Sequence, residues 1–277
     1  MQSRGNGMDF LTEIIADKRR RLAITEAEFP LAELRECAKE VRSRSTRNAF
    51  RQALGKASVN IIAEFKRASP SQGVIRAGAE AAQIAREYEA NGAAAVSVLT
   101  EESRFQGSLD DLRAVCAAVK VPVLRKDFVV DEYQIYETAA AGADAVLLIV
   151  AALDDQTLGR LRRLAEDELG LDALVEVHSR KELRRALTCG GSFVGVNNRD
   201  LRTFAVSLEP SIELAQHFPS GLIAISESGL RSASELARLQ AIGYRGFLIG
   251  ENLMREDSPG EALRRLISET ETQRAAL

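Results

Sequence analysis

Two ionisable side chains of opposite charge stand two residues apart at the end of an apolar run. In the segment IIAEFKRASP, Glu64 and Lys66 follow Ile62 at alternate positions. Side chains alternate between the two faces of a strand, so all three should project to the same side. Such a pair is costly to bury without further partners, whereas at the exposed carboxyl end of a strand it can meet a substrate. The pair is therefore a candidate catalytic site.

Ionisable side chains also end other apolar runs. Lys126 stands two positions after Leu124, and Glu176 two positions after Leu174, so each charge should lie on the inward face beside a core residue. Each residue alone could simply solubilise a loop, but a shared inward position favours function. A lysine and a carboxylate that face each other can act as general acid and base, with burial lowering the pKa of the lysine and the carboxylate raising it. Other polar residues that follow such runs are Asn197, Arg199 and Glu227.

Glycine and serine follow the last two apolar runs, where backbone amides could bind an anion. Ser228 and Gly229 come after one run, and Gly250 and Glu251 after the next. In barrel enzymes the loops at these positions and the start of a short helix commonly bind phosphate. Tight turns are the alternative use of these glycines. Ser69 begins a loop, SPSQG, whose hydroxyl groups could close over the same ligand.

Three further residues are weaker candidates. His178 comes two residues after Glu176 and could donate a proton, although support of that carboxylate is the more common use of such a neighbour. Phe105 and Phe128 lie just beyond the runs 94–99 and 122–126 and could form an aromatic wall for a planar ligand, or could pack in the core.

These candidates need a scaffold that brings the ends of many strands to one rim. Beyond residue 58, short apolar runs alternate with longer amphipathic segments at the spacing of a strand, a loop and a helix. This order predicts an α/β fold, a (β/α)8 TIM barrel, in which the chemistry collects at the carboxyl ends of the strands. The expected strands are 60–66, 94–99, 122–126, 145–150, 173–177, 193–197, 222–227 and 246–250. The expected helices are 79–91, 109–119, 131–141, 153–169, 180–188, 209–217, 232–241 and 259–268.

The first 58 residues break this alternation. Segments 10–22 and 31–40 have helical composition and no strand is expected, so residues 1–58 should form an N-terminal helical extension packed on the barrel. Residues 59–277 should form the catalytic barrel, within a single structural domain overall. The basic run KRRR at 18–21 is followed by two glutamates and should be a solvated helix face.

The balance of charge argues against nucleic acid or an anionic membrane as a partner. The 277 residues include 37 Lys and Arg against 40 Asp and Glu, a net charge of -3. The three cysteines follow no metal-binding pattern and should be reduced, buried thiols, and with only two histidines we expect no metal. The longest apolar run, 143–153, is too short to span a bilayer, and the first nine residues carry no secretory signal. We expect a cytoplasmic protein.

Taken together, the motifs resemble those of one enzyme family. They are IIAEFKRASPSQG, VSVLTEESRFQGS, VPVLRKDFVVDEYQIYE, GADAVLLIVAAL, LVEVHS, GVNNRDLRTF, SESGL and FLIGENLM. The chain resembles indole-3-glycerol phosphate synthase, and its helical N-terminal extension is also similar to that family's. The resemblance implies ring closure of 1-(2-carboxyphenylamino)-1-deoxyribulose 5-phosphate, with loss of carbon dioxide and water, in tryptophan biosynthesis. It implies a phosphorylated small-molecule substrate and no cofactor.

The resemblance also implies roles for the candidate residues. Lys126 matches the family's general acid, Glu176 its acid-base carboxylate, and Lys66 the lysine that holds the substrate carboxylate. Glu64 matches the carboxylate that orients this lysine. The positions that bind the substrate phosphate in the family correspond to Ser69, Ser228, Gly229, Gly250 and Glu251. Further substrate contacts correspond to Asn197, Arg199 and Glu227. Gln72 departs from the pattern, because the family often has a lysine in that loop.

Two alternatives stay open from the sequence. A Schiff-base phosphosugar aldolase of the same architecture would use Lys126 or Lys66 as its nucleophile. A non-catalytic barrel that binds a partner enzyme would be expected to lack Lys126 or Glu176, and both are present. We expect a monomer, because a barrel of this size with an N-terminal cap can stand alone.

Overall fold

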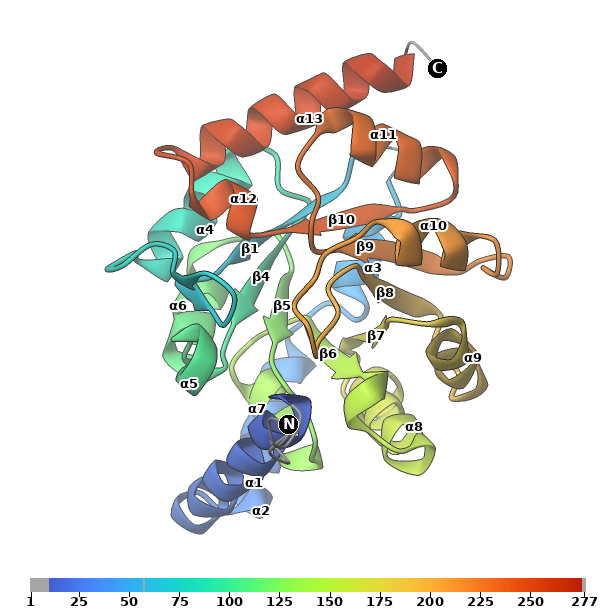
Figure 1. Ribbon diagram of the computed structural model, residues 1–277. Coiled ribbons are helices and arrows are strands. Elements are labelled where there is room, and N and C mark those ends of the chain that lie inside the picture. The colour runs from blue at the N-terminus through green and yellow to red at the C-terminus, as the bar shows by residue number, and fades with distance from the viewer. Residues whose placement is uncertain (1–9, 57, 276–277) are drawn as a thin grey trace, which may run out of the picture.

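The computed structural model describes residues 10–56 and 58–275, and its centre is a closed barrel of eight parallel strands (Figure 1). The strands neighbour one another in the order β1-β10-β9-β8-β7-β6-β5-β4. The barrel closes because β1 pairs with both β4 and β10. Helices surround the strands on the outside (Figure 1). The predicted (β/α)8 barrel with extra N-terminal helices is confirmed. The segment in which we expect no secretory signal, residues 1–9, lies outside the described residues.

The barrel strands lie within one residue of the predicted runs at each end. Their side chains alternate between the barrel interior and the surrounding helices. Ile62, Leu124 and Leu174 belong to the apolar cluster that fills the interior, whereas Ile61 and Val123 pack beneath the helices. The strands are β1 (Ile61–Phe65), β4 (Ala95–Leu99), β5 (Val123–Lys126), β6 (Ala145–Ile149), β7 (Asp172–Val177), β8 (Phe193–Asn197), β9 (Ile223–Glu227) and β10 (Gly246–Ile249).

The helices between and after these strands coincide with the expected amphipathic segments. Five of them begin at a side-chain cap, in which Ser108, Asp131, Asp154, Ser179 or Ser232 accepts a hydrogen bond from a backbone N–H of the first turn. The helices are α4 (Ala81–Ala90), α6 (Leu109–Ala118), α7 (Glu132–Ala140), α8 (Asp155–Arg163), α9 (Arg180–Thr188), α10 (Glu209–Ala215), α11 (Ala233–Ala241) and α13 (Pro259–Ala275). The last helix runs beyond its expected end because Thr270 is still buried.

Several short elements lie outside the predicted pattern, because segments of two to six residues show no hydrophobic period. They are α3 (Ala49–Leu54), α5 (Glu102–Phe105), the 3-10 turn η1 (Val150–Ala152) and the hairpin of β2 (Ala68–Ser69) and β3 (Gly73–Val74). The π turn η2 (Leu164–Glu168) directly follows α8 and lies within the expected helix 153–169. The short helix expected after the last strand is α12 (Glu251–Met254). The α3 helix closes the amino end of the barrel, since Phe50 and Leu54 belong to the interior cluster.

The N-terminal helices extend further than predicted, as α1 (Phe10–Glu28) and α2 (Leu31–Ser43), and lie beside α7 (Figure 1). Ile14 of α1 belongs to the interior cluster, and the ring of Phe10 lies 6.5 Å from that of Phe128. The prediction that residues 18–21 form a solvated face is wrong for Lys18. Its Nζ is buried 2.9 Å from Asp127 Oδ1, because α1 crosses the loop that follows β5.

The prediction of buried thiols is also wrong. Cys37 is exposed, and Cys116 and Cys189 are half-buried against the core cluster. All three cysteines are free thiols.

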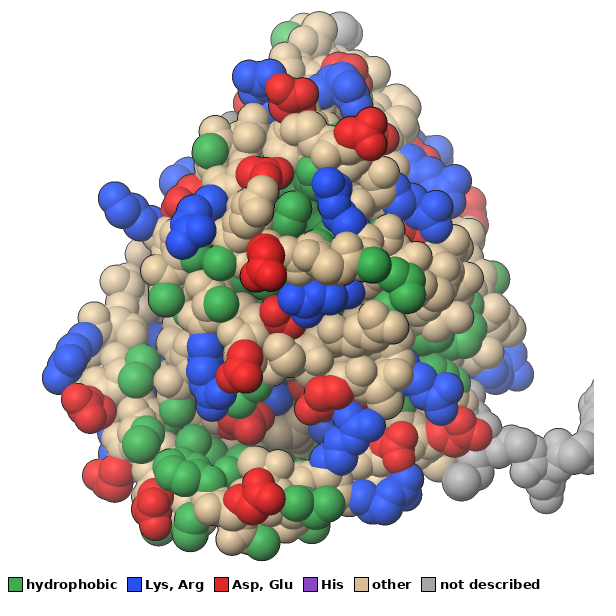
Figure 2. Space-filling view, turned by 90° about the vertical axis from the view of Figure 1, so that its left-hand side faces the viewer, with side chains coloured by type: hydrophobic (Ala, Val, Ile, Leu, Met, Phe, Trp, Pro, Cys, Tyr) green, Lys and Arg blue, Asp and Glu red, His purple; other side chains and the backbone are tan. Residues whose placement is uncertain are grey.

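Charges of both signs are interspersed over the face shown in Figure 2, where Lys and Arg side chains alternate with Asp and Glu. Among the helices formed by residues 10–56 and 58–275, none has an apolar stretch long enough to cross a membrane.

Candidate active site

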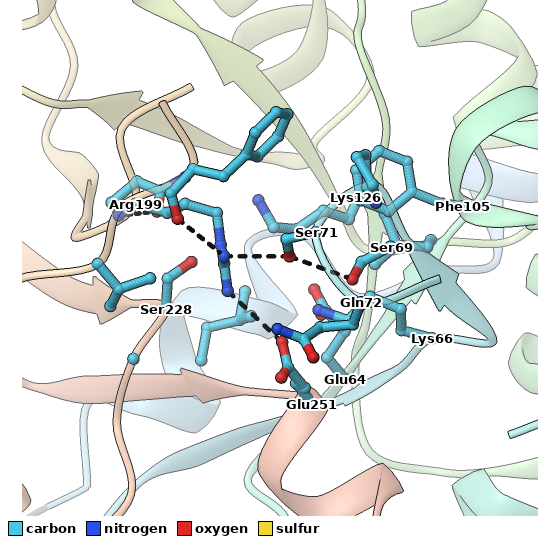
Figure 3. Close-up of a pocket in the computed structure, with 18 of the residues that line it drawn as sticks. Glu64, Lys66, Ser69, Ser71, Gln72, Phe105, Lys126, Arg199, Ser228 and Glu251 are labelled. Carbon is cyan, nitrogen blue, oxygen red and sulfur yellow. Dashed lines mark hydrogen bonds and ion pairs between the residues drawn. The ribbon is translucent and has the colours of Figure 1, made fainter. Parts of the chain in front are cut away.

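A cavity of about 600 Å³ opens at the carboxyl ends of the barrel strands (Figure 3). Thirteen of the fifteen candidate residues line it; they are Glu64, Lys66, Ser69, Phe105, Lys126, Phe128, Glu176, Asn197, Arg199, Ser228, Gly229, Gly250 and Glu251. The exceptions are His178 and Glu227, and Glu227 is 1% exposed and lies beneath Lys126. The barrel therefore brings together residues that end or follow seven separate runs.

Lys126 lies among carboxylates on the floor of the cavity. Its Nζ is 2.9 Å from Glu176 Oε2 and 3.1 Å from Glu227 Oε2. Asn197 donates a hydrogen bond from Nδ2 to the other oxygen of Glu176, at 3.1 Å. These contacts join β5, β7, β8 and β9. They place Lys126 and Glu176 within hydrogen-bond distance, as proton transfer requires.

Burial and charge act in opposite directions on these groups. Burial lowers the pKa of Lys126, but the surrounding carboxylates outweigh it, so the net shift is upward and the ammonium form persists. Burial raises the pKa of Glu176, but Lys126 and His178 draw it down to about 2. Burial raises the pKa of Glu227 to about 7, with Glu176 adding to the rise and Lys126 opposing it. The two carboxyl groups therefore differ in charge although both contact Lys126. Glu176 is ionised and can act as a base, whereas Glu227 keeps its proton up to near neutral pH.

Glu64 and Lys66 form the ion pair that their spacing predicts, with Lys66 Nζ 2.8 Å from Glu64 Oε1 (Figure 3). The Glu64 side chain is buried, while Lys66 faces the cavity. Glycine on the neighbouring strands makes room for two of the carboxylates. A Cβ at Gly250 would overlap Glu64 Oε1, and a Cβ at Gly195 would overlap Glu227 Oε1.

The opposite end of the cavity is built from loops and carries guanidinium groups. Ser228 and Gly229 both adopt left-handed backbone, with φ of 66° and 77°. Arg199 donates a hydrogen bond to Ser71 Oγ at 3.3 Å, and its Nη2 lies 3.5 Å from Glu251 Oε2 (Figure 3). Nested backbone amides beside an arginine suit a phosphate group.

Aromatic rings form one wall of the cavity, as predicted for Phe105 and Phe128, whose centroids are 6.4 Å apart. Phe10 from α1 joins them, and its ring also lies 4.9 Å from that of Phe204. The result is an apolar surface that suits a planar group.

Sequence reasoning missed Phe10, Phe204, Arg231 and Arg255, all of which line the cavity. The other residues were selected because they end or directly follow an apolar strand run. None of these four does so, and the sequence therefore carried no signal for them. Arg255 also donates a hydrogen bond to Gln72 Oε1 at 2.6 Å, which ties the β2–β3 hairpin to the end of α12. His178 lies behind Glu176, outside the lining, as the sequence suggested for a supporting residue.

Comparison with known proteins relates the chain to one family. The family profile described as indole-3-glycerol phosphate synthase matches residues 11–266. An indole-3-glycerol phosphate synthase of Carboxydothermus hydrogenoformans is 45% identical over 264 residues, which cover 94% of this chain and 100% of the relative. The enzyme of the same name from Koribacter versatilis is 47% identical over 257 residues, covering 93% of this chain and 98% of the relative.

Solved structures of lower identity share the barrel fold. The 3-hexulose-6-phosphate synthase of Salmonella typhimurium superposes with a TM-score of 0.62 at 13% identity, covering 78% of this chain and 100% of that one. The thiamine phosphate pyrophosphorylase of Pyrococcus furiosus gives a TM-score of 0.58 at 14% identity, covering 77% of this chain and 96% of that one.

Proposed function

The chain belongs to the indole-3-glycerol phosphate synthase family, and from this premise we propose how its residues carry out the family's reaction. The enzyme is a carboxy-lyase of tryptophan biosynthesis. It closes 1-(2-carboxyphenylamino)-1-deoxyribulose 5-phosphate to indole-3-glycerol phosphate, with loss of carbon dioxide and water. The proposal concerns which side chain does what.

The substrate lies along the cavity with its phosphate at the loop end and its aromatic ring at the phenylalanine wall. Backbone amides near Ser228, Gly229 and Gly250 hold the phosphate, together with Arg199. The ring lies against Phe105 and its neighbours, and Lys66 pairs with the ring carboxylate. Binding energy from the phosphate, remote from the reacting carbons, orients the carbonyl over Lys126.

Ring closure begins as the aromatic carbon attacks the ribulose carbonyl. Lys126, held as an ammonium by its carboxylate neighbours, transfers a proton to the developing alkoxide oxygen. Glu176 stabilises the cationic ring that forms, since it is ionised and lies 2.9 Å from the same lysine.

Two steps complete the reaction. The iminium formed by ring closure accepts the electron pair of the bond to the carboxylate, so carbon dioxide leaves and a neutral ring remains. Loss of the hydroxyl as water then requires a proton on the leaving oxygen, from Lys66, and removal of a ring proton, by Glu176. Glu64 keeps Lys66 in position at 2.8 Å.

The observation that carries this assignment is the contact between Lys126 and Glu176 at the cavity floor. Lys126→Ala should lower kcat by about 100- to 10,000-fold, the usual value of general acid catalysis, with little change in KM. Product formation is followed by indole fluorescence, with little interference because the chain has no tryptophan. Lys120→Ala, at an exposed lysine outside the cavity, is the matched control. Near-normal turnover in Lys126→Ala would overturn the acid assignment.

Borohydride trapping, combined with the fluorescence assay, separates the two rival functions. An aldolase would form a covalent imine with a carbonyl substrate, which borohydride would trap as a mass increase on Lys126 or Lys66. A folded wild type without synthase activity would favour that aldolase or a binding-only barrel, depending on the trapping result.

We further propose that the protein works as a cytoplasmic monomer, without nucleic acid or membrane partners. A net charge of -3 and the mixed signs of the surface in Figure 2 support this. Light scattering coupled to size exclusion should give a mass near 30.2 kDa, and a mass twice as large would contradict the proposal.

A further inference from the structure

The imidazole of His178 lies between two carboxylates that come from different elements. His178 directly follows β7, and its side chain is 16% exposed. Its Nδ1 is 3.3 Å from Glu182 Oε2, on α9, and its Nε2 is 3.5 Å from Glu176 Oε1, on β7. The backbone N–H of His178 also donates to Glu182 Oε2, at 2.8 Å, which fixes that carboxylate in place.

Each ring nitrogen faces a carboxylate oxygen, which favours a proton on both nitrogens. A neutral imidazole carries a single N–H, so one ring nitrogen would direct a lone pair at a carboxylate. The buried Nε2 has no hydrogen-bond partner within the described part of the chain, and Glu176 Oε1 lies 3.5 Å from it. An imidazolium can donate from both nitrogens, one toward each carboxylate.

The other charges around the pair act in both directions. Glu227 on β9 adds a third acidic side chain that raises the pKa of His178. The ammonium of Lys126 on β5 opposes a second positive charge, but it lies on the far oxygen of Glu176. The η1 turn, which packs against α9 and β7, has no ionisable side chain. Burial lowers the pKa of His178, but the three carboxylates outweigh it and the net shift is upward.

We propose that His178 is an imidazolium in the working enzyme and that, with Glu182, it is a positioning pair that keeps Glu176 ionised and directed toward Lys126. The inference rests on the proposed role of Glu176 in the ring closure. It assigns a role in the reaction to the first turn of α9. The carboxylate of Glu182 stabilises the positive charge of His178, and this positive charge stabilises the ionised form of Glu176. Neither residue touches the cavity.

Nitrogen NMR of the imidazole rings tests the charge directly. The chain has two histidines, so His217→Gln leaves a single ring to observe and should retain wild-type activity. We expect His178 to be doubly protonated at pH 7, where an ordinary histidine, with a pKa of about 6.5, is mostly neutral. Glu182→Gln keeps an oxygen to accept the backbone N–H but loses the charge, and should lower the midpoint of His178 by about one pH unit. A neutral His178 at pH 7 would overturn the proposal.

The pH dependence of turnover tests the consequence. Without the imidazolium, the pKa of Glu176 rises from about 2, so the acid limb of the kcat profile of His178→Gln should lie about one pH unit above that of wild type, with KM little changed. A purely structural role would lower activity equally at every pH and would contradict the inference. The NMR result needs no substrate, so an imidazolium signal in an inactive wild type would count against the proposed function and not against the charge of His178.

Discussion

The four charged side chains on alternate strands, Glu64, Lys126, Glu176 and Glu227, make one layer of the barrel interior acidic. Lys66 adds a second ammonium, so three carboxylates face two lysines. One carboxylate therefore has no lysine of its own, and Glu227 is the one whose pKa rises, to about 7. Charged groups placed for catalysis often lower the free energy of unfolding. In this layer, the effect should be measurable at Glu227.

Glu227→Gln should therefore stabilise the folded protein at high pH. The folded-state pKa of about 7 lies above the ordinary 4.5, so the native state binds the proton more tightly, and stability falls as pH rises from about 4.5 to about 7. The amide removes this loss, so Tm should exceed that of wild type by several degrees at pH 8 and by less at pH 4.5. Calorimetry at both values measures it, and an equal shift at the two would contradict the assigned charge state.

Gly195 places Glu227 by leaving room for it. A Cβ on Gly195 would overlap Glu227 Oε1, so Gly195→Ala should push the carboxylate away from Lys126. A displacement of about 1 Å in a catalytic group can cost about 100-fold, and we expect a loss of about 10- to 100-fold in kcat. Gly159→Ala in α8, where a Cβ meets only the flexible end of Arg163, is the control. In a Glu227→Ala background the same change at Gly195 should have little further effect on kcat.

At the scale of elements, α1 is tied to the strand that carries Lys126. Lys18 reaches from α1 to Asp127, the residue after Lys126, and Thr100 and Arg125 bind the same carboxylate. This buried network holds the backbone directly beyond the proposed acid.

Lys18→Met should accordingly destabilise the fold. Loss of one partner leaves Asp127 with part of its charge uncompensated, and we expect a cost of about 2–4 kcal/mol in the free energy of unfolding. Arg20→Met is the matched control, since its side chain is 70% exposed and such a change usually stays within about 0.5 kcal/mol. Urea titrations of both variants compare the two, and equal midpoints would show that the buried pair adds nothing.

The strands were predictable because each is a short apolar run between turn residues, and alternation along it decides which side chains point inward. This is why Glu64, Lys126 and Glu176 could be placed together before any contact was known. The same logic could not place Lys18 or Phe10. Both belong to a helix whose docking depends on a loop more than 100 residues away, and a local pattern carries no information about that partner.

Over the whole molecule, the N-terminal extension contacts the barrel interior at both ends. Ile14 of α1 lies at the mouth, and Phe50 and Leu54 of α3 lie at the base, all in one apolar cluster with side chains of the strands. A segment that shares a core with the barrel at two opposite ends should not unfold by itself, which supports the prediction of a single structural domain.

A tryptophan placed between the first two helices tests this cooperativity. The chain has no tryptophan, and Phe29 is 37% exposed between α1 and α2, so Phe29→Trp adds one fluorescent probe without overpacking a core. If the extension and the barrel unfold together, the fluorescence transition in urea should coincide with the loss of far-ultraviolet circular dichroism. A fluorescence midpoint at clearly lower urea would show that the helices detach first. In that case α1 would behave as a removable cover of the cavity, and the contact of Lys18 with Asp127 would be too weak to hold it.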